Sequence, residues 1–401
     1  MGVSHLVQST RAGASYGLAL LGLVIVANLI KYPAFRFGPQ YAAATGTSLL
    51  EGYRRQGTWA LVLYGLATLG TMFTVQAAVT VVTAGLAISA LGLPKDPVLV
   101  SGGLLLLCGG LLAVGRYQWL DRVTKVLVAL LTLSTLAATI MVLPRVDFGT
   151  LVDFAPLRAD PKALFFVAAL IGWMPSAIDV AVWQSLWTLA KRSANPEASS
   201  MKGSMMDFHI GYIGTAALAL CFVVMGAGVL HGSGLTLSDS ASGFAQQIIS
   251  MYQRALGAWA GPVVGVSALA VMLSTTLTVL DGFPRALAVL FARLSGPEAA
   301  GVDELEQPGG RRAYFAAMAL LVLGALGVIA ALLSSLKLLI DVATTLSFLT
   351  APVLALLNHR AMHGSEVPAA ARPSPGLSLG SGLGIAVQAA FALAYLFLRY
   401  G

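Results

Sequence analysis

The amino-acid sequence predicts an all-α integral membrane protein with interrupted membrane helices. The chain has 401 residues, of which 57% are hydrophobic and only 10% are charged, whereas soluble domains carry about 25% charged residues. Apolar stretches long enough to cross about 30 Å of hydrocarbon recur from one end of the chain to the other. One of them, 162–190, contains both Pro175 and Asp179. Composition therefore predicts the class of protein, and the interrupted stretch predicts its architecture.

The apolar stretches define the membrane helices in order. They predict helices at 16–35, 58–90, 98–115, 119–143, 162–190, 205–231, 259–292, 313–334, 336–358 and 377–399. Short loops rich in proline, glycine and charge separate them. Residues 240–255 predict an amphipathic helix that lies on one surface of the membrane. No separate soluble domain is apparent, so residues 1–401 are expected to form a single transmembrane domain.

The positive charges in the loops predict how the chain is oriented. If the loop after the 16–35 helix faces the cytoplasm, that side collects thirteen Lys and Arg residues and the opposite side seven. This bias predicts a multi-pass protein of the plasma (inner) membrane, in contact with lipid, with its C-terminus outside. The net charge of +7 is explained by this topology, and no nucleic-acid partner is expected. The oligomeric state stays open.

Pro175 interrupts a stretch that otherwise predicts one long helix. A proline removes a backbone donor and frees a carbonyl group, and such irregular backbone persists at membrane depth only inside protein or beside a watery cavity. Secondary transporters use such breaks to bind ions with free carbonyls and helix ends. The alternative is a proline kink that serves packing alone. Ser176 and Asp179 lie three residues apart, on one helical face, and this favours a site.

A second interruption is expected at the start of the chain, because transporters with broken helices are commonly built from inverted repeats. Residues 1–15 would then be the remnant of the first broken helix. His5, Gln8 and Ser9 fall on one face if a helix follows. Met1 stands directly at the expected break, so we expect the first half-helix to be missing here and to lie upstream of the sequence given.

Several segments resemble the Nramp family, the natural resistance-associated macrophage protein metal-ion transporters. The stretch "GLVIVANLIKYPAFRFGPQYAAATGTSLLEGYRR" (22–55) is similar to the second helix of the family and the loop after it. "IGWMPS" resembles the Met-Pro-His signature of its sixth helix, and "LSTTLTVLDGFPRAL" (273–287) resembles its eighth. The resemblance implies a 5+5 inverted-repeat fold, with repeats at 16–143 and 162–358, discontinuous first and sixth helices, and an additional C-terminal helix at 377–399.

The resemblance also implies a set of site residues. Gly2 and His5 stand where the family has an aspartate and an asparagine, and Met174 keeps the thioether ligand. The main-chain carbonyl that the family uses falls on Ile171, and Ser176 replaces a histidine. The 58–90 helix has no acidic residue, although the family places proton-path carboxylates there. Proton coupling by the usual route is therefore not expected.

These residues predict a secondary transporter of a divalent transition-metal ion such as manganese or iron, because thioether and imidazole ligands suit such ions better than Mg²⁺ or Ca²⁺. Asp179 could supply the charge that Gly2 lacks, or it could be neutralised by Arg11 or Lys31. We expect Gln8, Arg11, Asp281 and Asp341 to serve gating or the ion pathway.

Two alternatives to metal transport stay open from the sequence. One is a transporter of the same fold that moves a small organic solute such as an amino acid, and the other is a membrane sensor without flux. An enzyme is not expected, because no Ser-His-Asp set is apparent and the five histidines are interpreted as scattered. No nucleotide-binding loop is present, and no cofactor is expected: the metal ion would be the substrate.

Overall fold

The computed structural model describes residues 2–93, 96–114, 118–160, 162–194, 200–300, 303–307, 309–332 and 335–400. This part of the chain is mostly helical and contains no strand. Nine of its helices are long and apolar enough to cross a membrane. The predicted all-α membrane protein is therefore confirmed.

The long helices follow the predicted order along the chain. They are α2 (Leu21–Thr45), α4 (Thr58–Leu91), α5 (Pro97–Val114), α6 (Gln118–Val142), α10 (Met201–Val229), α12 (Ala260–Ser295), α13 (Gly310–Leu332), α14 (Leu336–Met362) and α15 (Pro375–Tyr400). The shorter helices are η1 (Ser4–Ser9), α1 (Thr10–Tyr16), α3 (Leu49–Gln56), α7 (Ala155–Ala159), α8 (Ala163–Gly172), α9 (Asp179–Ala194) and α11 (Ala241–Leu256). Single turns complete the set: η2 (Leu143–Arg145), η3 (Phe148–Leu151), η4 (Glu304–Glu306) and η5 (Ala369–Ala371).

The helix predicted at 16–35 has the wrong boundaries, because α2 begins later and continues to Thr45. Pro33 and Pro39 lie inside α2, where neighbouring helices surround the backbone. Gly38 brings α2 against α9: a Cβ atom at Gly38 would lie 2.0 Å from a backbone oxygen of α9. The segment after residue 35 is therefore packed helix, and the polar and proline residues in it do not mark a loop.

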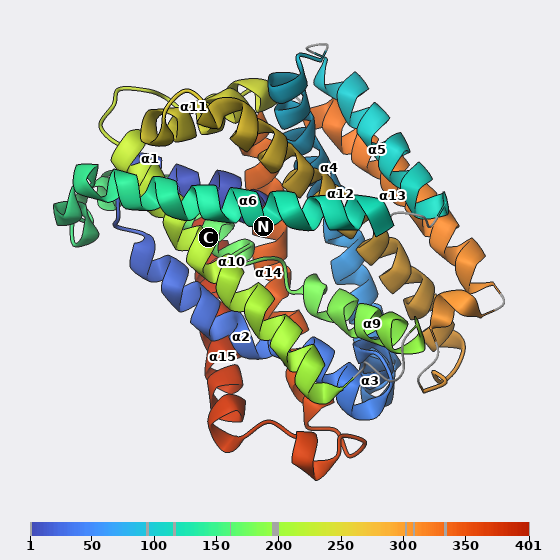
Figure 1. The fold of residues 1–401 in the computed structure, drawn as a ribbon. Coiled ribbons are helices and arrows are strands. Elements are labelled where there is room, and N and C mark those ends of the chain that lie inside the picture. The colour runs from blue at the N-terminus through green and yellow to red at the C-terminus, as the bar shows by residue number, and fades with distance from the viewer. Residues whose placement is uncertain are drawn as a thin grey trace.

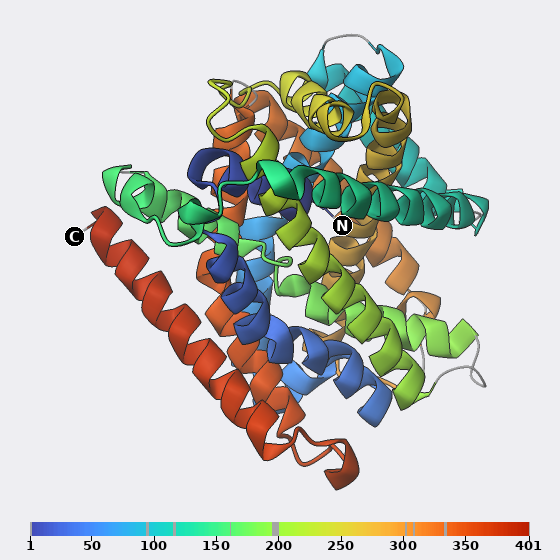
Figure 2. The same ribbon diagram turned by 60° about the vertical axis from the view of Figure 1, so that its left-hand side comes forward.

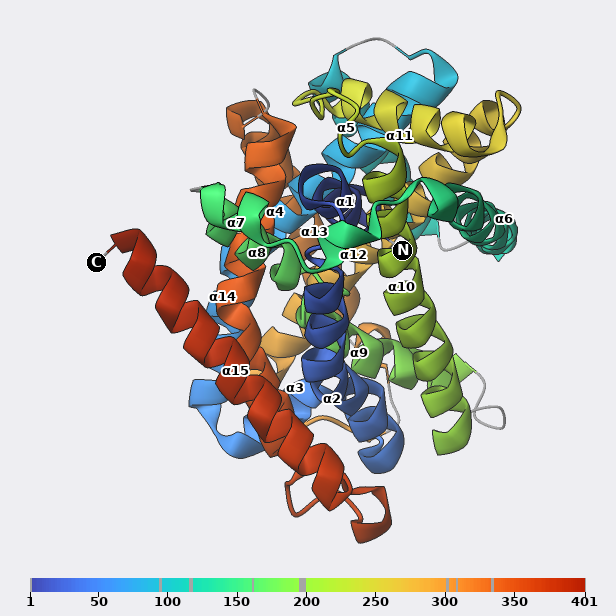
Figure 3. The ribbon, with the colours of Figure 1, turned by 90° about the vertical axis from the view of Figure 1, so that its left-hand side faces the viewer.

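The helices form a bundle with short elements at each end (Figure 1). The amphipathic segment predicted at 240–255 is α11, whose apolar face packs on α4, α6 and α12. Helix α3 lies at the opposite end from α11 (Figure 3). Helix α15 runs along the outside of the bundle (Figure 2) and packs on α2 and α14. Helix α15 is therefore peripheral, as are α5 and α13, whereas α4 is the most buried of the membrane-spanning helices in the described part of the chain.

Two parts of the chain are interrupted or short helices inside the bundle and do not cross it as one continuous helix. The stretch predicted at 162–190 is divided into α8 and α9, with residues 173–178 non-helical between them. At the start of the chain, Ser4–Ser9 is a turn of π-helix that continues into α1. Helix η1 contacts both α8 and α10. The predicted discontinuity of the sixth helix is confirmed, and its break lies beside the first segment.

Candidate functional site

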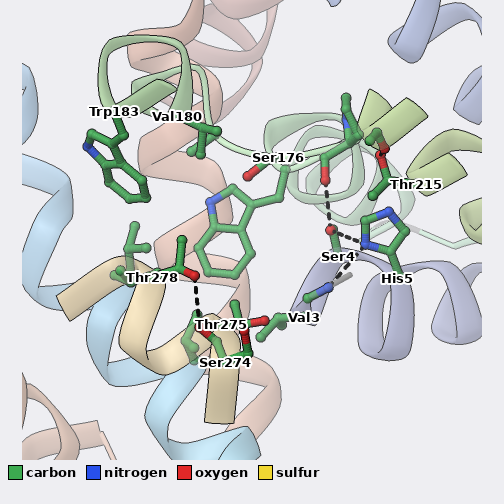
Figure 4. A pocket seen from close by; sticks show the side chains of 18 of the residues that line it. Val3, Ser4, His5, Ser176, Val180, Trp183, Thr215, Ser274, Thr275 and Thr278 are labelled. Carbon is green, nitrogen blue, oxygen red and sulfur yellow. Dashed lines mark hydrogen bonds between the residues drawn. The ribbon is translucent and has the colours of Figure 1, made fainter. Parts of the chain in front are cut away.

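The break between α8 and α9 is joined directly to η1. The Ser4 hydroxyl group donates a hydrogen bond to the carbonyl oxygen of Pro175 over 2.9 Å (Figure 4). Ser9 in turn donates to the carbonyl of Ser4 over 3.1 Å. Both ends of these bonds are buried. The Pro175 carbonyl, which belongs to the non-helical segment 173–178, is thus satisfied by the other interrupted segment, as expected for irregular backbone buried within protein.

A cavity of about 350 Å³ lies at this junction. Among the predicted site residues, Gly2, His5, Pro175 and Ser176 line it. Figure 4 shows further lining residues from α9, α10 and α12, namely Trp183, Thr215, Ser274, Thr275 and Thr278. Trp173 lines the cavity as well. No carboxylate is among the described residues that line the cavity. Its polar surface therefore consists of hydroxyl groups, backbone, the Gln184 amide and one imidazole.

His5 is held in one orientation by its neighbour in η1. Its Nδ1 lies 2.9 Å from the Ser4 hydroxyl oxygen. That hydroxyl group already donates its hydrogen to Pro175, so its contact with His5 calls for a proton on Nδ1, whereas the backbone N–H of Gly2, 3.4 Å from the same nitrogen, calls for an acceptor there. The other ring nitrogen, Nε2, is buried without a hydrogen-bond partner among the described residues, and its lone pair is free in the form of the ring that carries the proton on Nδ1. In that form the neutral imidazole is a suitable metal ligand through Nε2.

The carbonyl end of α8 is occupied by a side chain that the sequence analysis considered only as a base for Asp179. Lys31 of α2 is 0% exposed, and its Nζ donates to the carbonyl oxygens of Ile171 over 2.6 Å and Gly172 over 2.9 Å. The Ile171 carbonyl expected to serve as a metal ligand is therefore hydrogen-bonded to an ammonium group. Ile171 does not line the cavity.

Two other expected ligands also lie away from the cavity. The side chain of Met174 is completely buried and does not line it. Asp179 is 2% exposed and is not among the residues that line the cavity. Its Oδ1 has no hydrogen-bond partner among the described residues. The ligand roles of Ile171, Met174 and Asp179 stay predictions.

The proposed neutralisation of Asp179 by Arg11 or Lys31 is not what the structure contains. Lys31 binds the α8 carbonyls, and Arg11 binds Asp341 of α14 through two contacts, Nη1 to Oδ1 at 2.6 Å and Nη2 to Oδ2 at 3.2 Å. Gln8 bridges the same pair: it accepts from Arg11 over 2.7 Å and donates to Asp341 over 3.4 Å. The three residues predicted for gating thus form one cluster that ties α1 to α14.

The loop end of α1 is fixed by a second contact. The Tyr16 hydroxyl group donates to Oδ2 of Asp160 over 2.6 Å, and the backbone of Lys162 donates to Oδ1 over 2.8 Å. These two hydrogen bonds, from Tyr16 first and then Lys162, hold the pKa of Asp160 below its usual value. Helix α1 is therefore anchored both to α14 and to the loop that precedes α8.

Asp281, the fourth residue predicted for gating, lies in a different cluster. It accepts hydrogen bonds from Trp187 of α9 over 2.7 Å and from Tyr314 of α13 over 2.8 Å. Arg285 lies 3.3 Å from the same carboxylate and 3.0 Å from Asp303. Asp281 therefore joins α9, α12 and α13, and it does not line the cavity.

A histidine pair was missed by the sequence analysis. His359 and His363 stack with ring centroids 4.2 Å apart at the end of α14. They contact Ser381 and Ser378 of α15 over 3.0 and 2.9 Å. Their spacing of four residues was the signal that could have revealed them. Within the described part of the chain, no group of three or more His, Cys, Asp or Glu side chains could hold a metal ion.

A family model described as natural resistance-associated macrophage protein-like (Nramp) matches residues 1–397. The chain belongs to this family. An uncharacterized protein of Pasteurella multocida is 36% identical to it over 288 residues, which are 71% of this Nramp chain and 66% of that protein. The match thus spans about two thirds of the length of this curated relative.

Two solved structures show the fold of this Nramp protein. A manganese transporter of Eremococcus coleocola superposes with a TM-score of 0.70 at 13% identity, covering 99% of this chain and 83% of that one. Mhp1, a nucleobase-cation-symport-1 family transporter with a bound hydantoin, superposes with a TM-score of 0.56 at 12% identity, covering 99% and 89%. At such identities the likeness concerns the fold alone, and it confirms the predicted broken-helix transporter fold.

Proposed function

We propose that this protein is a secondary transporter that moves a divalent transition-metal ion, of the manganese or iron kind, by alternating access. The observation that carries the proposal is the direct contact of the two interrupted segments, Ser4 to Pro175, beside a cavity in a member of the Nramp family. The related fold of a protein named as a manganese transporter supports it. The same family match favours a transporter over an enzyme, and a metal ion over an organic solute or a sensor without flux.

In this proposal His5 is the side-chain ligand that lines the cavity. With its proton on Nδ1, His5 would bind the ion through Nε2, while hydroxyl groups, the backbone and retained water supply oxygen ligands, as transition metals such as Mn²⁺ accept both donor types. Gly2 and Ser176 provide space and backbone at the two breaks. Met174 would join only if the 173–178 segment rearranges during transport. Helix α4 carries no acidic residue, so the proposal includes no carboxylate proton path along it.

The Gln8, Arg11 and Asp341 cluster would close one entrance to the cavity. It joins α1 to the first part of α14, whose start hydrogen-bonds to Asp239 in the loop before α11. On the other side the cavity reaches Gln184, and a second cleft towards the far end of α9 shares that residue. We propose that this conformation is closed towards α11 and that the ion passes by way of Gln184.

The loop charges extend the proposal to the cell. The α11 end would face outward and the α3 end the cytoplasm of a plasma (inner) membrane protein, with the C-terminus outside. The division into repeats at 16–143 and 162–358 is proposed on the same basis, from the pattern of the helices. The surrounding lipid and the oligomeric state are not constrained further.

Uptake into proteoliposomes that contain a metal-quenched dye tests the proposal. We expect Mn²⁺ or Fe²⁺ to quench the dye faster than in empty liposomes, and a panel of amino acids to cause no competing flux. The variant His5→Ala should slow uptake, whereas His363→Ala, which changes an exposed histidine outside the cavity, should not. Repeating the assay with and without a pH gradient shows whether protons move. No flux of any divalent ion in the wild type would refute the proposed function.

A further inference from the structure

Lys31 lies in the middle of a membrane helix and cannot extend its charge to water. It stands about 15 Å along the helix from the start of α2 and about 21 Å from its end, at 1.5 Å per residue. A lysine side chain near a helix end can place its charge in the interface, but this one is 0% exposed. Its Nζ is therefore fully buried at membrane depth.

The charge of Lys31 is stabilised by the end of a helix instead of by an acid. No carboxylate among the described residues lies within ion-pair distance of its Nζ. Its hydrogen bonds go to the carbonyls of Ile171 and Gly172, the last two residues of α8. The Ile171 carbonyl also accepts the backbone N–H of Met174 over 3.1 Å, and the negative end of the helix dipole adds to the preference for a cation at this position. The carbonyl end of α8 is thus a cation site, and a side chain of the protein fills it.

A metal ion and the ammonium group cannot share this position. Divalent ions bind oxygen ligands at about 2.0–2.6 Å, and Nζ lies 2.6 Å from the Ile171 oxygen. An ion bound to that oxygen would stand at most about 5 Å from Nζ, in a buried region where like charges repel strongly. Occupation of the Ile171 carbonyl by Lys31 therefore excludes a divalent ion from it.

We infer that Lys31 is a resident cation that permanently occupies the carbonyl end of α8 and restricts the transported ion to the His5 side of the cavity. This inference rests on the proposed function for the identity of the ion. Phe35, one helical turn after Lys31, and Trp173, directly after α8, both line the cavity. The ammonium charge therefore lies behind the cavity wall, where it weakens the binding of a second cation and determines how much positive charge the site accepts.

The decisive measurement compares Mn²⁺ binding to the full-length protein in detergent, by the shift in thermal unfolding, for Lys31 variants. Lys31→Gln can still donate hydrogen bonds to a carbonyl but carries no charge, and Lys31→Ala empties the position. Lys31→Arg keeps the charge, and Lys202→Gln, an exposed lysine, is the matched control for loss of one positive charge. We expect at least tenfold tighter Mn²⁺ binding for the Gln and Ala variants, with the Arg variant and the control equal to the wild type.

Rescue by a small amine separates a resident cation from a packing residue. Methylammonium should raise the melting temperature of Lys31→Ala and compete with Mn²⁺ there, and it should do neither in the wild type. A purely structural lysine predicts a lower melting temperature in every variant with an unchanged Mn²⁺ dependence, and that result would overturn the inference. If Lys31→Ala does not fold, the Mn²⁺ affinity of Lys31→Gln alone tests the inference.

The outcome is independent of the test of flux. A wild type that shows no divalent-ion uptake refutes the proposed function, whatever the variants bind. A wild type that takes up Mn²⁺, with Lys31→Gln binding Mn²⁺ no more tightly, refutes the resident cation and leaves the transport proposal standing.

Discussion

The cluster of Arg11, Asp341 and Gln8 gives the sharpest prediction about the transport cycle. If it closes the α11 end of the cavity, Asp341→Asn should favour the open state, because Asn keeps the shape of the side chain and loses its charge. A hydrogen bond between charged partners contributes about 1.5–3 kcal/mol. The Asp341 side chain is 36% exposed, so water screens it and the lower value applies. About 1.5 kcal/mol corresponds to a roughly tenfold larger open population.

Labelling of a cavity cysteine measures this population. Thr275 lines the cavity, and Thr275→Cys would be introduced into a chain whose two buried native cysteines, Cys108 and Cys221, are replaced by alanine. A membrane-impermeant maleimide added on the α11 side should react about tenfold faster after Asp341→Asn. The matched control is Asp239→Asn, which breaks the Lys337 ion pair at the same end (3.2 Å) and should leave the rate unchanged. Equal rates in all three proteins would refute the gate.

Three further changes test the packing and charges around the site. Gly172→Ala places a Cβ atom 2.0 Å from the Thr344 carbonyl oxygen, so overpacking should lower the free energy of unfolding by about 1–3 kcal/mol and with it the melting temperature. The control is Gly214→Ala, whose Cβ atom meets no neighbouring atom within 4 Å and should leave the melting temperature unchanged. Asp281→Asn should lower the melting temperature, because its charged contacts to α9, α12 and α13 weaken; an unchanged value would make that cluster irrelevant to stability. Asp179→Asn should slow Mn²⁺ uptake without lowering the melting temperature, and equal uptake would exclude Asp179 from the mechanism.

The sequence predicted well those features that depend on short stretches of chain. Hydropathy is a local property, so the spans of α4, α5, α6, α12 and α15 agree with the expectation within a few residues. Pro175 revealed the break between α8 and α9 for the same reason, since a proline acts on its own turn. The end of α2 was predicted wrongly, because Pro33 and Pro39 signal helix termination in water but are tolerated where other helices surround the backbone.

Features that join distant parts of the chain were not predictable in the same way. Lys31 was considered only as a possible intramembrane base for Asp179, and the observed extent of α2 puts it in the middle of that helix. Its acceptors on α8 are 140 residues away, and no local pattern links the two. Likewise Gln8, Arg11 and Asp341 were each suspected, but their union in one cluster depends on how α1 packs against α14.

The charged residues of the interior fall into two groups with opposite physical meaning. Arg11 is balanced by Asp341, and Arg285 by Asp281, so these charges stabilise the conformation that contains them. Lys31 and Asp179 each lie buried without an oppositely charged partner among the described residues, although α2 and α9 pack together.

A buried charge without a partner costs several kcal/mol, and an ion pair between Lys31 and Asp179 would reduce that cost. Since this fold keeps them apart, removing the Asp179 charge should not destabilise it, whereas loss of a clustered charge should. If Asp179→Asn is as stable as the wild type and yet takes up Mn²⁺ more slowly, the Asp179 charge acts in a conformation other than the one described here. The Asp179 variant is therefore the test of alternating access in this protein.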